Sequence, residues 1–209
     1  MSLRDRFIAM KSIDELRRVI ASKDFELHSK LTERYDKILS DEYGDADDLN
    51  ADQAADLQET REEIATALDR ILMSEQPPAT EHGDWSGAFE LIADLIGLHI
   101  PCKFPINSYK HLQTWAPYRE HIRPQISPGV DKLLSHLERG RPLFGAAMES
   151  DWAMYAWLNG DEIACLHDSL VKVALGDGND SDLADFHKVL IASLKSLRKK
   201  GAELLLVAD

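Results

Sequence analysis

The apolar run LLLVA at residues 204–208 places the strongest constraint on the fold. A strand that is apolar at every position is typical of one covered on both faces. Its backbone N–H and C=O groups must find partners, because buried and unpaired groups cost free energy. The sequence therefore predicts a sheet, in which residues 142–148 or 154–158 are available to pair with this strand.

A long helix is predicted immediately before this strand, over about residues 181–200. Its apolar residues recur at intervals of three, four, four and three positions: Leu183, Phe186, Leu190, Leu194 and Leu197. Gly201 follows, and glycine readily takes the left-handed backbone conformation that ends many helices. We therefore expect a helix, a glycine and a buried strand in this order.

Apolar spacing predicts seven further helices, two of which follow a capping residue, Asn50 or Asn159. Ser12 and Glu15 have the spacing of a capping box. Pro117 is expected to end a short helix, because its ring would clash with a carbonyl one turn earlier. These helices cover about residues 13–20, 24–39, 50–71, 85–96, 109–115, 128–137 and 159–173, the sixth opening at Pro128. The predicted class is a predominantly helical α+β fold, with about eight helices and a small sheet that includes the C-terminal strand.

Residues 74–83, SEQPPATEHG, contain two adjacent prolines and no apolar periodicity. We interpret them as a linker between an N-terminal helical arm of residues 1–73 and a mainly helical α+β core of residues 84–209. The helix at residues 85–96 is apolar on nearly all sides, which is typical of a helix in the middle of a core. One integrated domain is the alternative organisation.

Negative charge is concentrated in one segment. Residues 41–63 contain ten carboxylates and one base, Arg61, and so account for nine of the thirteen net negative charges. Such a surface attracts cations and repels polyanions. The candidate partner-binding residues are Asp47, Asp48, Asp52, Asp56, Glu59 and Glu63. A solvated helix face that only keeps the protein in solution is the alternative interpretation.

Nucleic acid is not an expected partner, because affinity for a phosphate backbone comes mainly from Lys and Arg and the net charge is −13. The basic cluster lies at the end of a predicted helix, where cations complement the helix dipole: Lys195, Arg198, Lys199 and Lys200. No segment approaches the ~20 apolar residues of a membrane span, and no signal-peptide pattern is present. The two cysteines, Cys102 and Cys165, are interpreted as core residues. We predict a cytoplasmic protein with no membrane partner.

Residue spacing argues against several chemical sites. Cys102, His111 and His121 are nine and ten residues apart, which matches no compact zinc module. No segment has the glycine and glutamate of a calcium loop, a phosphate-binding glycine loop or a hydrolase nucleophile motif. His167 and Asp168 are adjacent on a helix, and we expect their side chains to point about 100° apart. We therefore expect neither a metal nor a cofactor.

Aromatic residues supply one candidate small-molecule site. His111 and Trp115 are four residues apart and so share a helix face. Together with aromatic residues from other segments they would line a concave pocket that carries one titratable group. The candidate pocket residues are Tyr109, His111, Trp115, Trp152 and Trp157. A tryptophan-rich packing contact is the alternative.

Two segments resemble the ends of a known family. The segments VLIASLKSLRKKGAELLLVAD and SIDELRRVIASKDFELHSKL are similar to YfbM-like bacterial proteins of unknown function. Those proteins pair an N-terminal helical segment with a final helix–glycine–strand unit. The resemblance implies an α+β fold in the bacterial cytosol, and it implies no activity.

Our leading hypothesis is a non-enzymatic, cytosolic protein-binding module of bacterial type, immunity-like or regulatory, whose acidic helical arm masks a basic partner. The rival hypothesis is a small-molecule-binding protein or enzyme that uses the aromatic pocket. A third alternative is a homodimer that forms through the helix at residues 85–96 or through the first two helices.

Overall fold

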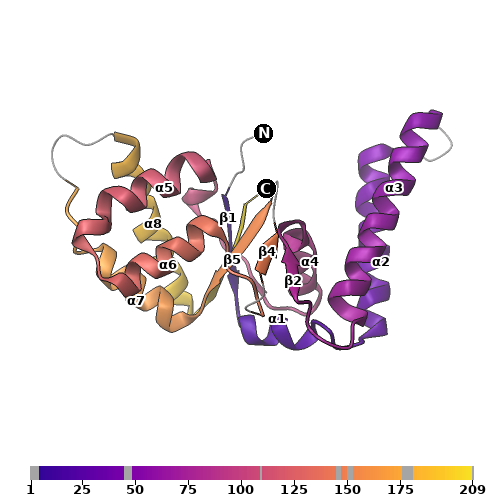
Figure 1. Ribbon diagram of the computed structural model, residues 1–209, viewed down its shortest axis with the longest axis horizontal. Helices are drawn as coiled ribbons and strands as arrows, with labels where there is room; N and C mark the ends of the chain where they lie inside the picture. The colour runs from indigo at the N-terminus through magenta and orange to yellow at the C-terminus, as the bar shows by residue number, and fades with distance from the viewer. Residues whose placement is uncertain are drawn as a thin grey trace. The chain divides into compact units, whose positions relative to one another are not determined.

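The computed structural model describes residues 5–44, 49–108, 110–144, 147–149, 153–175 and 181–208. The chain forms two compact units: unit 1 comprises Met1–Glu15 and Thr80–Asp209, and unit 2 comprises Leu16–Ala79. Eight α-helices, a four-stranded sheet and a two-stranded sheet lie within the described residues (Figure 1). The predicted class, a predominantly helical α+β fold, is confirmed.

The main sheet of unit 1 is built around its C-terminal strand. Its strands, in spatial order, are β3 (His99–Ile100), β1 (Asp5–Met10), β6 (Glu203–Ala208) and β5 (Met154–Leu158). All three pairings are antiparallel, and Leu206 of β6 lies opposite Phe7 of β1 and Ala156 of β5. The predicted C-terminal strand is confirmed, and β5 is one of its two expected partners. β1 was missed, because the charges of Asp5 and Arg6 interrupt its apolar pattern.

Four helices cover one face of the main sheet (Figure 1). They are α5 (His111–Ile122), α6 (Pro128–Arg139), α7 (Gly160–Leu170) and α8 (Ser181–Lys200). Alternate strand residues such as Phe7 and Leu206 point to this face. They share one buried core with Trp115 of α5 and Phe186 of α8.

The opposite face of the main sheet packs against α4 and a small parallel sheet. These elements are α4 (Ser86–Leu95), β2 (Thr80–His82) and β4 (Ala147–Glu149). The ring of Tyr155 on β5 meets Phe89 of α4 edge-on, with centroids 4.9 Å apart. β2 lies inside the predicted linker and β4 is shorter than the predicted strand at residues 142–148, so both predictions are corrected. The two short strands form because each supplies the other with a backbone ladder.

Helix α5 is longer than predicted. It begins at His111 and continues past Pro117 to Ile122. Trp115, Tyr118 and Ile122 are spaced three and four residues apart, and all three are fully buried. Burying each large side chain contributes about 1.5–3 kcal/mol, which together outweighs the roughly 3 kcal/mol that an interior proline costs.

Other predicted helix ends are confirmed. Asn159 and Glu162 form a capping box at the start of α7, and Pro128 is the first residue of α6. Gly201 has a φ of +60°, the left-handed conformation expected after α8. Short 3-10 helices occupy Gly83–Trp85 (η3), Pro105–Ser108 (η4) and Arg123–Gln125 (η5).

Unit 2 is a helical hairpin preceded by a short helix. Its elements are α1 (Ile13–Val19), which begins in unit 1, α2 (Phe25–Tyr43), α3 (Ala51–Leu68) and the π-helical turn η2 (Asp69–Met73). Tyr43 at the end of α2 donates to Asp56 near the start of α3, and His28 near the start of α2 contacts Asp69 just after α3. The two long helices therefore run antiparallel. Their buried residues are all leucines: Leu27, Leu31, Leu39, Leu57 and Leu68.

The helical unit differs from the predicted arm at its beginning. Because β1 pairs within the main sheet, unit 2 starts near Leu16 and not at residue 1. It extends to Ala79, which lies within the predicted linker of residues 74–83. Asn50 caps α3 as expected, through a capping box with Gln53.

Truncating the central strand should destabilise the protein strongly. Leu206 is fully buried, and Leu206→Ala should lower the free energy of unfolding by about 2–5 kcal/mol, because the change leaves a cavity between two packed layers. Urea unfolding followed by circular dichroism measures the loss. Val171→Ala is the matched control, since Val171 is 50% exposed and should change stability by less than about 0.5 kcal/mol. Equal effects of the two substitutions would contradict the central position of β6.

Candidate functional site

Four of the predicted partner-binding residues form a stripe on α3. Asp52, Asp56, Glu59 and Glu63 follow one another at intervals of four, three and four residues, which places them on one helix face. All four are exposed, and none forms an ion pair with a Lys or Arg among the described residues. Asp56 accepts a hydrogen bond from the Tyr43 hydroxyl at 2.5 Å, which raises the pKa of that phenol. We call these four residues the acidic stripe. Asp47 and Asp48 lie outside the described residues.

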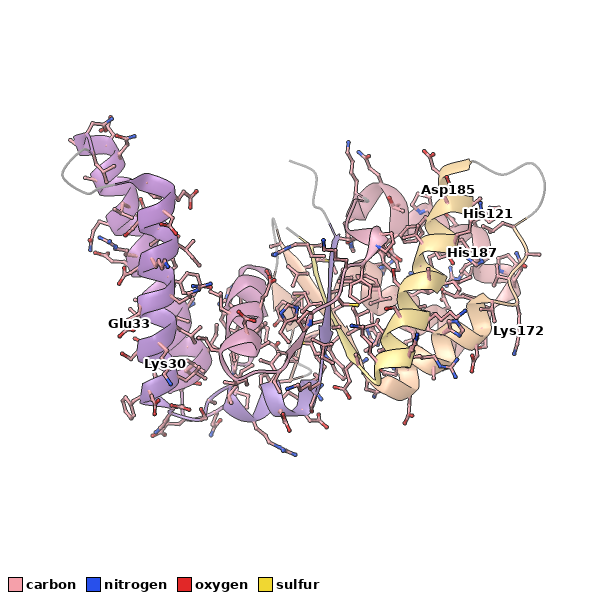
Figure 2. All side chains as sticks on the ribbon, turned by 180° about the vertical axis from the view of Figure 1, so that it is seen from behind. Lys30, Glu33, His121, Lys172, Asp185 and His187 are labelled. Carbon is pink, nitrogen blue, oxygen red and sulfur yellow. The ribbon has the colours of Figure 1, made fainter. Side chains whose placement is uncertain are left out.

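The negative charge belongs mainly to α3. α3 carries five carboxylates and one base, whereas α2 carries five carboxylates and three bases. On α2, Lys30 donates to Glu26 at 2.6 Å, and Lys30 and Glu33 are exposed charges of opposite sign (Figure 2). Arg61, the single base of α3, pairs with Asp36 of α2 at 3.2 Å. The described part of the hairpin therefore concentrates its uncompensated charge on the acidic stripe.

A buried polar cluster joins β1 to α5 and α6. Asp5 is fully buried, and its carboxylate accepts hydrogen bonds from His111 Nδ1–H at 2.5 Å and Trp115 Nε1–H at 2.6 Å. The other ring nitrogen of His111, Nε2, donates to the backbone carbonyl of Glu138 at 2.8 Å. An imidazolium, which carries a proton on each ring nitrogen, satisfies both acceptors at once. The cluster is a buried ion pair between Asp5 and His111.

The surroundings of His111 raise its pKa. Burial by itself would lower the pKa, because it disfavours the charged ring. The hydrogen bond and negative charge of Asp5, with the carbonyl of Glu138, outweigh burial, and the pKa lies above its usual value. A histidine with both nitrogens engaged has no lone pair with which to act as a base. The cluster is therefore structural.

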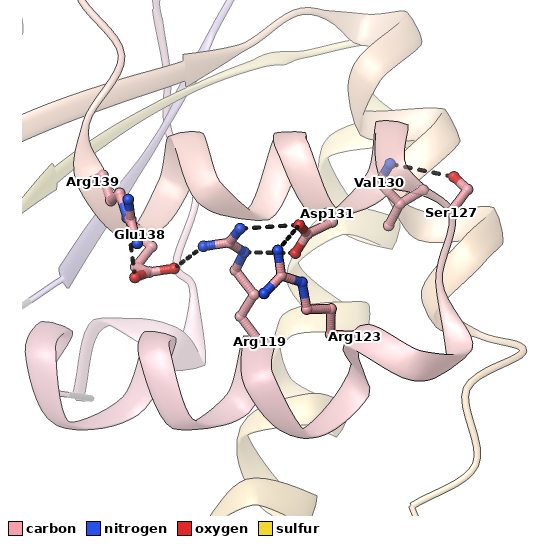
Figure 3. A network of polar contacts seen from close by, with 7 residues as sticks. All are labelled: Arg119, Arg123, Ser127, Val130, Asp131, Glu138 and Arg139. Carbon is pink, nitrogen blue, oxygen red and sulfur yellow. Dashed lines mark hydrogen bonds and ion pairs between the residues drawn. The ribbon is translucent and has the colours of Figure 1, made fainter.

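An arginine network holds α5 against α6 (Figure 3). Arg119 Nε and Nη2 donate to the two carboxylate oxygens of Asp131 at 2.7 and 3.0 Å, and Nη1 donates to Glu138 at 2.7 Å. Arg123 contacts Asp131 and Arg139 contacts Glu138, each at 3.4 Å. The hydrogen bond from Arg119 lowers the pKa of Asp131. A bidentate arginine of this kind fixes the relative position of two helices.

Of the candidate pocket residues that the structure describes, His111 and Trp115 pack together and Trp157 lies apart from them. His111 and Trp115 are fully buried on the helix-covered face of the main sheet. Trp157 of β5 points to the opposite face, because side chains alternate along a strand and its neighbours Ala156 and Leu158 belong to the helix-side core. Tyr109 and Trp152 lie outside the described residues. The packing of His111 and Trp115 favours a core contact over a pocket.

Trp157 has its own polar surroundings. Its indole N–H donates to the carbonyl of Pro142 at 3.0 Å. The guanidinium carbon of Arg141 lies 3.4 Å from its ring centroid, and Arg141 also donates to Glu162 of α7 at 2.7 Å. Cation–π stacking and an ion pair therefore fix the loop before β4 on the edge of the main sheet.

Glu81 is a buried polar residue that the sequence analysis missed. Its carboxylate is fully buried and accepts hydrogen bonds from the backbone N–H groups of Leu143 and Phe144, at 2.7 and 2.8 Å. It also accepts from the hydroxyl of Tyr155. Burial, and then the charge of Glu81, raise the pKa of Tyr155, so the phenol stays protonated and donates. An isolated acid in a predicted linker gave no signal of this role.

His167 and Asp168 contact one another, contrary to expectation. Their side chains are 3.1 Å apart, and Arg198 of α8 donates to the same carboxylate at 2.5 Å. The rotamer of Asp168 that reaches these donors overrides the angle between adjacent helix positions. The hydrogen bond of His167, and then that of Arg198, lower the pKa of Asp168. Cys165 on the same helix is exposed and Cys102 is half-buried, so the core interpretation is wrong for Cys165.

A second histidine is buried between α5 and α8. This residue is His187 of α8 (Figure 2), and its Nδ1 lies 2.7 Å from the hydroxyl of Tyr118. Burial lowers the pKa of His187 and raises that of Tyr118. Near neutral pH the uncharged imidazole therefore accepts a hydrogen bond from the phenol, which links the two helices.

Replacing Asp5 should give a stability loss that depends on pH. Asp5→Asn removes the counter-charge of His111 and should lower the free energy of unfolding by about 3–5 kcal/mol near pH 6. Because the pKa of His111 is raised in the folded protein, the ion pair contributes fully below the unfolded pKa of about 6.5. Its contribution is lost as the pH rises through the raised folded pKa, so the gap between wild type and variant should narrow as the pH is increased from about 6 into the alkaline range.

Urea unfolding across this range measures the gap. His136 and His187 also make stability depend on pH, because burial lowers their pKa values. Both proteins contain these histidines, so their contributions cancel in the difference between the two free energies of unfolding. Asp161→Asn, at an exposed position, is the control and should show little pH dependence of its effect. A gap that is constant with pH would contradict the ion pair.

A metal site, a membrane span or a known relative would each indicate a function. In the described part of the chain, no three or more His, Cys, Asp or Glu side chains are grouped so as to hold a metal ion. None of the described helices combines the length and the apolar character needed to cross a membrane. No family model, no curated protein and no solved structure matches the chain.

Proposed function

We propose that this protein is a non-enzymatic, cytoplasmic protein-binding module of bacterial type, and that its acidic stripe binds a basic protein. The supporting observation is the geometry of the stripe: four exposed carboxylates on one helix face, without Lys or Arg partners among the residues described. Asp47 and Asp48 stay candidate binding residues on the evidence of the sequence alone. Masking a basic partner suits an immunity-like or regulatory role.

The alignment of the stripe favours docking over a purely solubilising role. Solubility requires net charge, but it does not require that the charges share one face. Carboxylates three or four residues apart on a helix repel one another, at about 0.2–0.5 kcal/mol for each pair. A basic partner relieves this repulsion, so complementary charge on that partner strengthens and directs binding.

The rival functions receive less support. A small-molecule site at His111 and Trp115 would need an opening, and both side chains are fully buried. A homodimer through α4 would need an unused apolar face. Phe89 and Ile92 of α4 are already buried in the single chain, while Leu95 is 42% exposed.

Neutralising the stripe should abolish capture of basic proteins. We expect the wild type, immobilised at low ionic strength, to retain basic proteins from a bacterial lysate and to release them as salt screens the charges. The stripe variant combines Asp52→Asn, Asp56→Asn, Glu59→Gln and Glu63→Gln, and it should retain few of them. Quantitative mass spectrometry of the retained proteins measures the difference.

The matched control removes the same charge elsewhere. Asp94→Asn, Glu120→Gln, Asp161→Asn and Asp185→Asn change four exposed carboxylates of unit 1. This control should retain the same proteins as the wild type. If the stripe variant also retained them, or if the control lost them equally, the stripe would not be the binding surface.

A smaller change to the stripe, Glu59→Gln with Glu63→Gln, should make the hairpin more stable than in the wild type. It removes two like-charge pairs of the stripe and spares Asp52, in the first turn of α3, and Asp56, which accepts from Tyr43, so the free energy of unfolding of the hairpin should rise by about 0.4–1 kcal/mol at low salt. Because salt screens this repulsion, the gain should shrink in about 1 M salt. Thermal unfolding at both ionic strengths measures the effect, and a destabilised variant would show that the stripe carboxylates support the fold.

A further inference from the structure

A groove of about 310 Å³ lies between α2 and α3. Most of its exposed lining area is apolar, with Leu39 of α2 and Ile64, Ala65 and Leu68 of α3 among the apolar residues. The lining also contains polar and charged residues: Thr32, Asp36, Gln58, Arg61 and the exposed carboxylate Glu62. We call this feature the hairpin groove. Its volume is at the small end of the range for ligand pockets, which suits a single large side chain.

The hairpin groove and the acidic stripe are on different sides of α3. An α-helix turns by about 100° per residue, which places Gln58 and Ala65 roughly 140° around α3 from the centre of the stripe. The groove is therefore a separate contact region. A partner that only approached the stripe would leave it empty.

We propose that the hairpin groove receives a large apolar side chain from a basic amphipathic helix of the partner protein. An apolar groove flanked by charge is the kind of surface that binds one face of an amphipathic helix. The charge of α2 and α3 selects the sign of that helix: together they carry ten carboxylates and four bases. A second copy of the hairpin would bring the same excess of negative charge and be repelled. The basic character of the partner rests on the proposed function.

Arg61 supplies a second observation at the same place. Its Nε is the one buried side-chain nitrogen or oxygen without a hydrogen bond among the residues described, and the side chain lines the groove. Asp36 lies 3.2 Å from this nitrogen and balances its charge. Arg61 and Asp36 therefore place one partly exposed ion pair in the wall of the groove, beside its apolar lining.

Filling the groove tests the proposal. Ala65 is exposed, so Ala65→Trp should fill the groove without disturbing the buried leucines, and circular dichroism checks that the variant folds. Ala55→Trp makes the same change at an exposed position of α3 outside the groove lining. The probe is a synthetic amphipathic helical peptide of lysine and leucine, and fluorescence anisotropy measures its Kd. We expect Ala65→Trp to weaken binding at least about tenfold and Ala55→Trp by less than about twofold.

Three further measurements define the occupant. A peptide with each leucine replaced by alanine keeps the charge and should bind the wild type about tenfold more weakly. A glutamate and leucine peptide keeps the apolar face and should not bind measurably. Light scattering should return a monomer mass for the wild type.

Each contrary outcome has one meaning. Equal binding of the leucine and alanine peptides would contradict the proposal that the hairpin groove receives a large apolar side chain. The proposed role of the acidic stripe would be unaffected. Binding of the glutamate peptide would overturn the basic character of the partner. A wild-type dimer that Ala65→Trp dissociates would make a second copy the occupant. Failure of both lysine peptides to bind would remove the proposed function together with this inference.

Discussion

Backbone pairing of β6 is the constraint on which the rest of unit 1 depends. Residues 204–208 are fully buried, so both edges of this strand must find hydrogen-bonding partners and both faces must be covered. β1 and β5 pair with its two edges, and both strands are distant from β6 in sequence. Four helices cover one face, while α4 and the small parallel sheet cover the other. Contacts so distant in sequence make folding of this unit depend on closing long loops.

Two buried carboxylates make this arrangement specific. Asp5 is satisfied by His111 and Trp115, and Glu81 by two backbone N–H groups and the hydroxyl of Tyr155. A shift of β1 by one residue would turn Asp5 to the other face of the sheet and leave His111 without its counter-charge. A shift of β2 by one residue would likewise move Glu81 away from its donors, which lie in the loop before β4 and on β5. We infer that both carboxylates select one register and disfavour its neighbours.

Local chemistry made part of the structure predictable. Caps such as Asn159 and the regular apolar spacing of α8 gave correct helices, because these signals act within a few residues. Elements decided by distant contacts were missed or mistaken: the charged end of β1 is stabilised by the Asp5 cluster, and α5 continues past Pro117 because its buried side chains outweigh the proline. The concentration of carboxylates in residues 41–63 predicted which segment carries the negative charge. The exposure of these carboxylates on α3, and the groove between α2 and α3, follow only from how the two helices pack.

The acidic stripe differs from the carboxylates that bind bases, which occur in both units, for example Asp36 with Arg61 in unit 2. In unit 1, Asp131 and Glu162 receive arginine side chains, and the buried acids receive two or three donors each. The acidic stripe receives no arginine or lysine within the described residues, although α2 beside it carries three bases. The electrostatic field of the acidic stripe extends over about 8 Å at physiological salt, so it acts on a partner before the two proteins touch. An apolar groove acts only on contact. In the proposed complex, the stripe would therefore set the association rate and its salt dependence, and the groove would set the residence time.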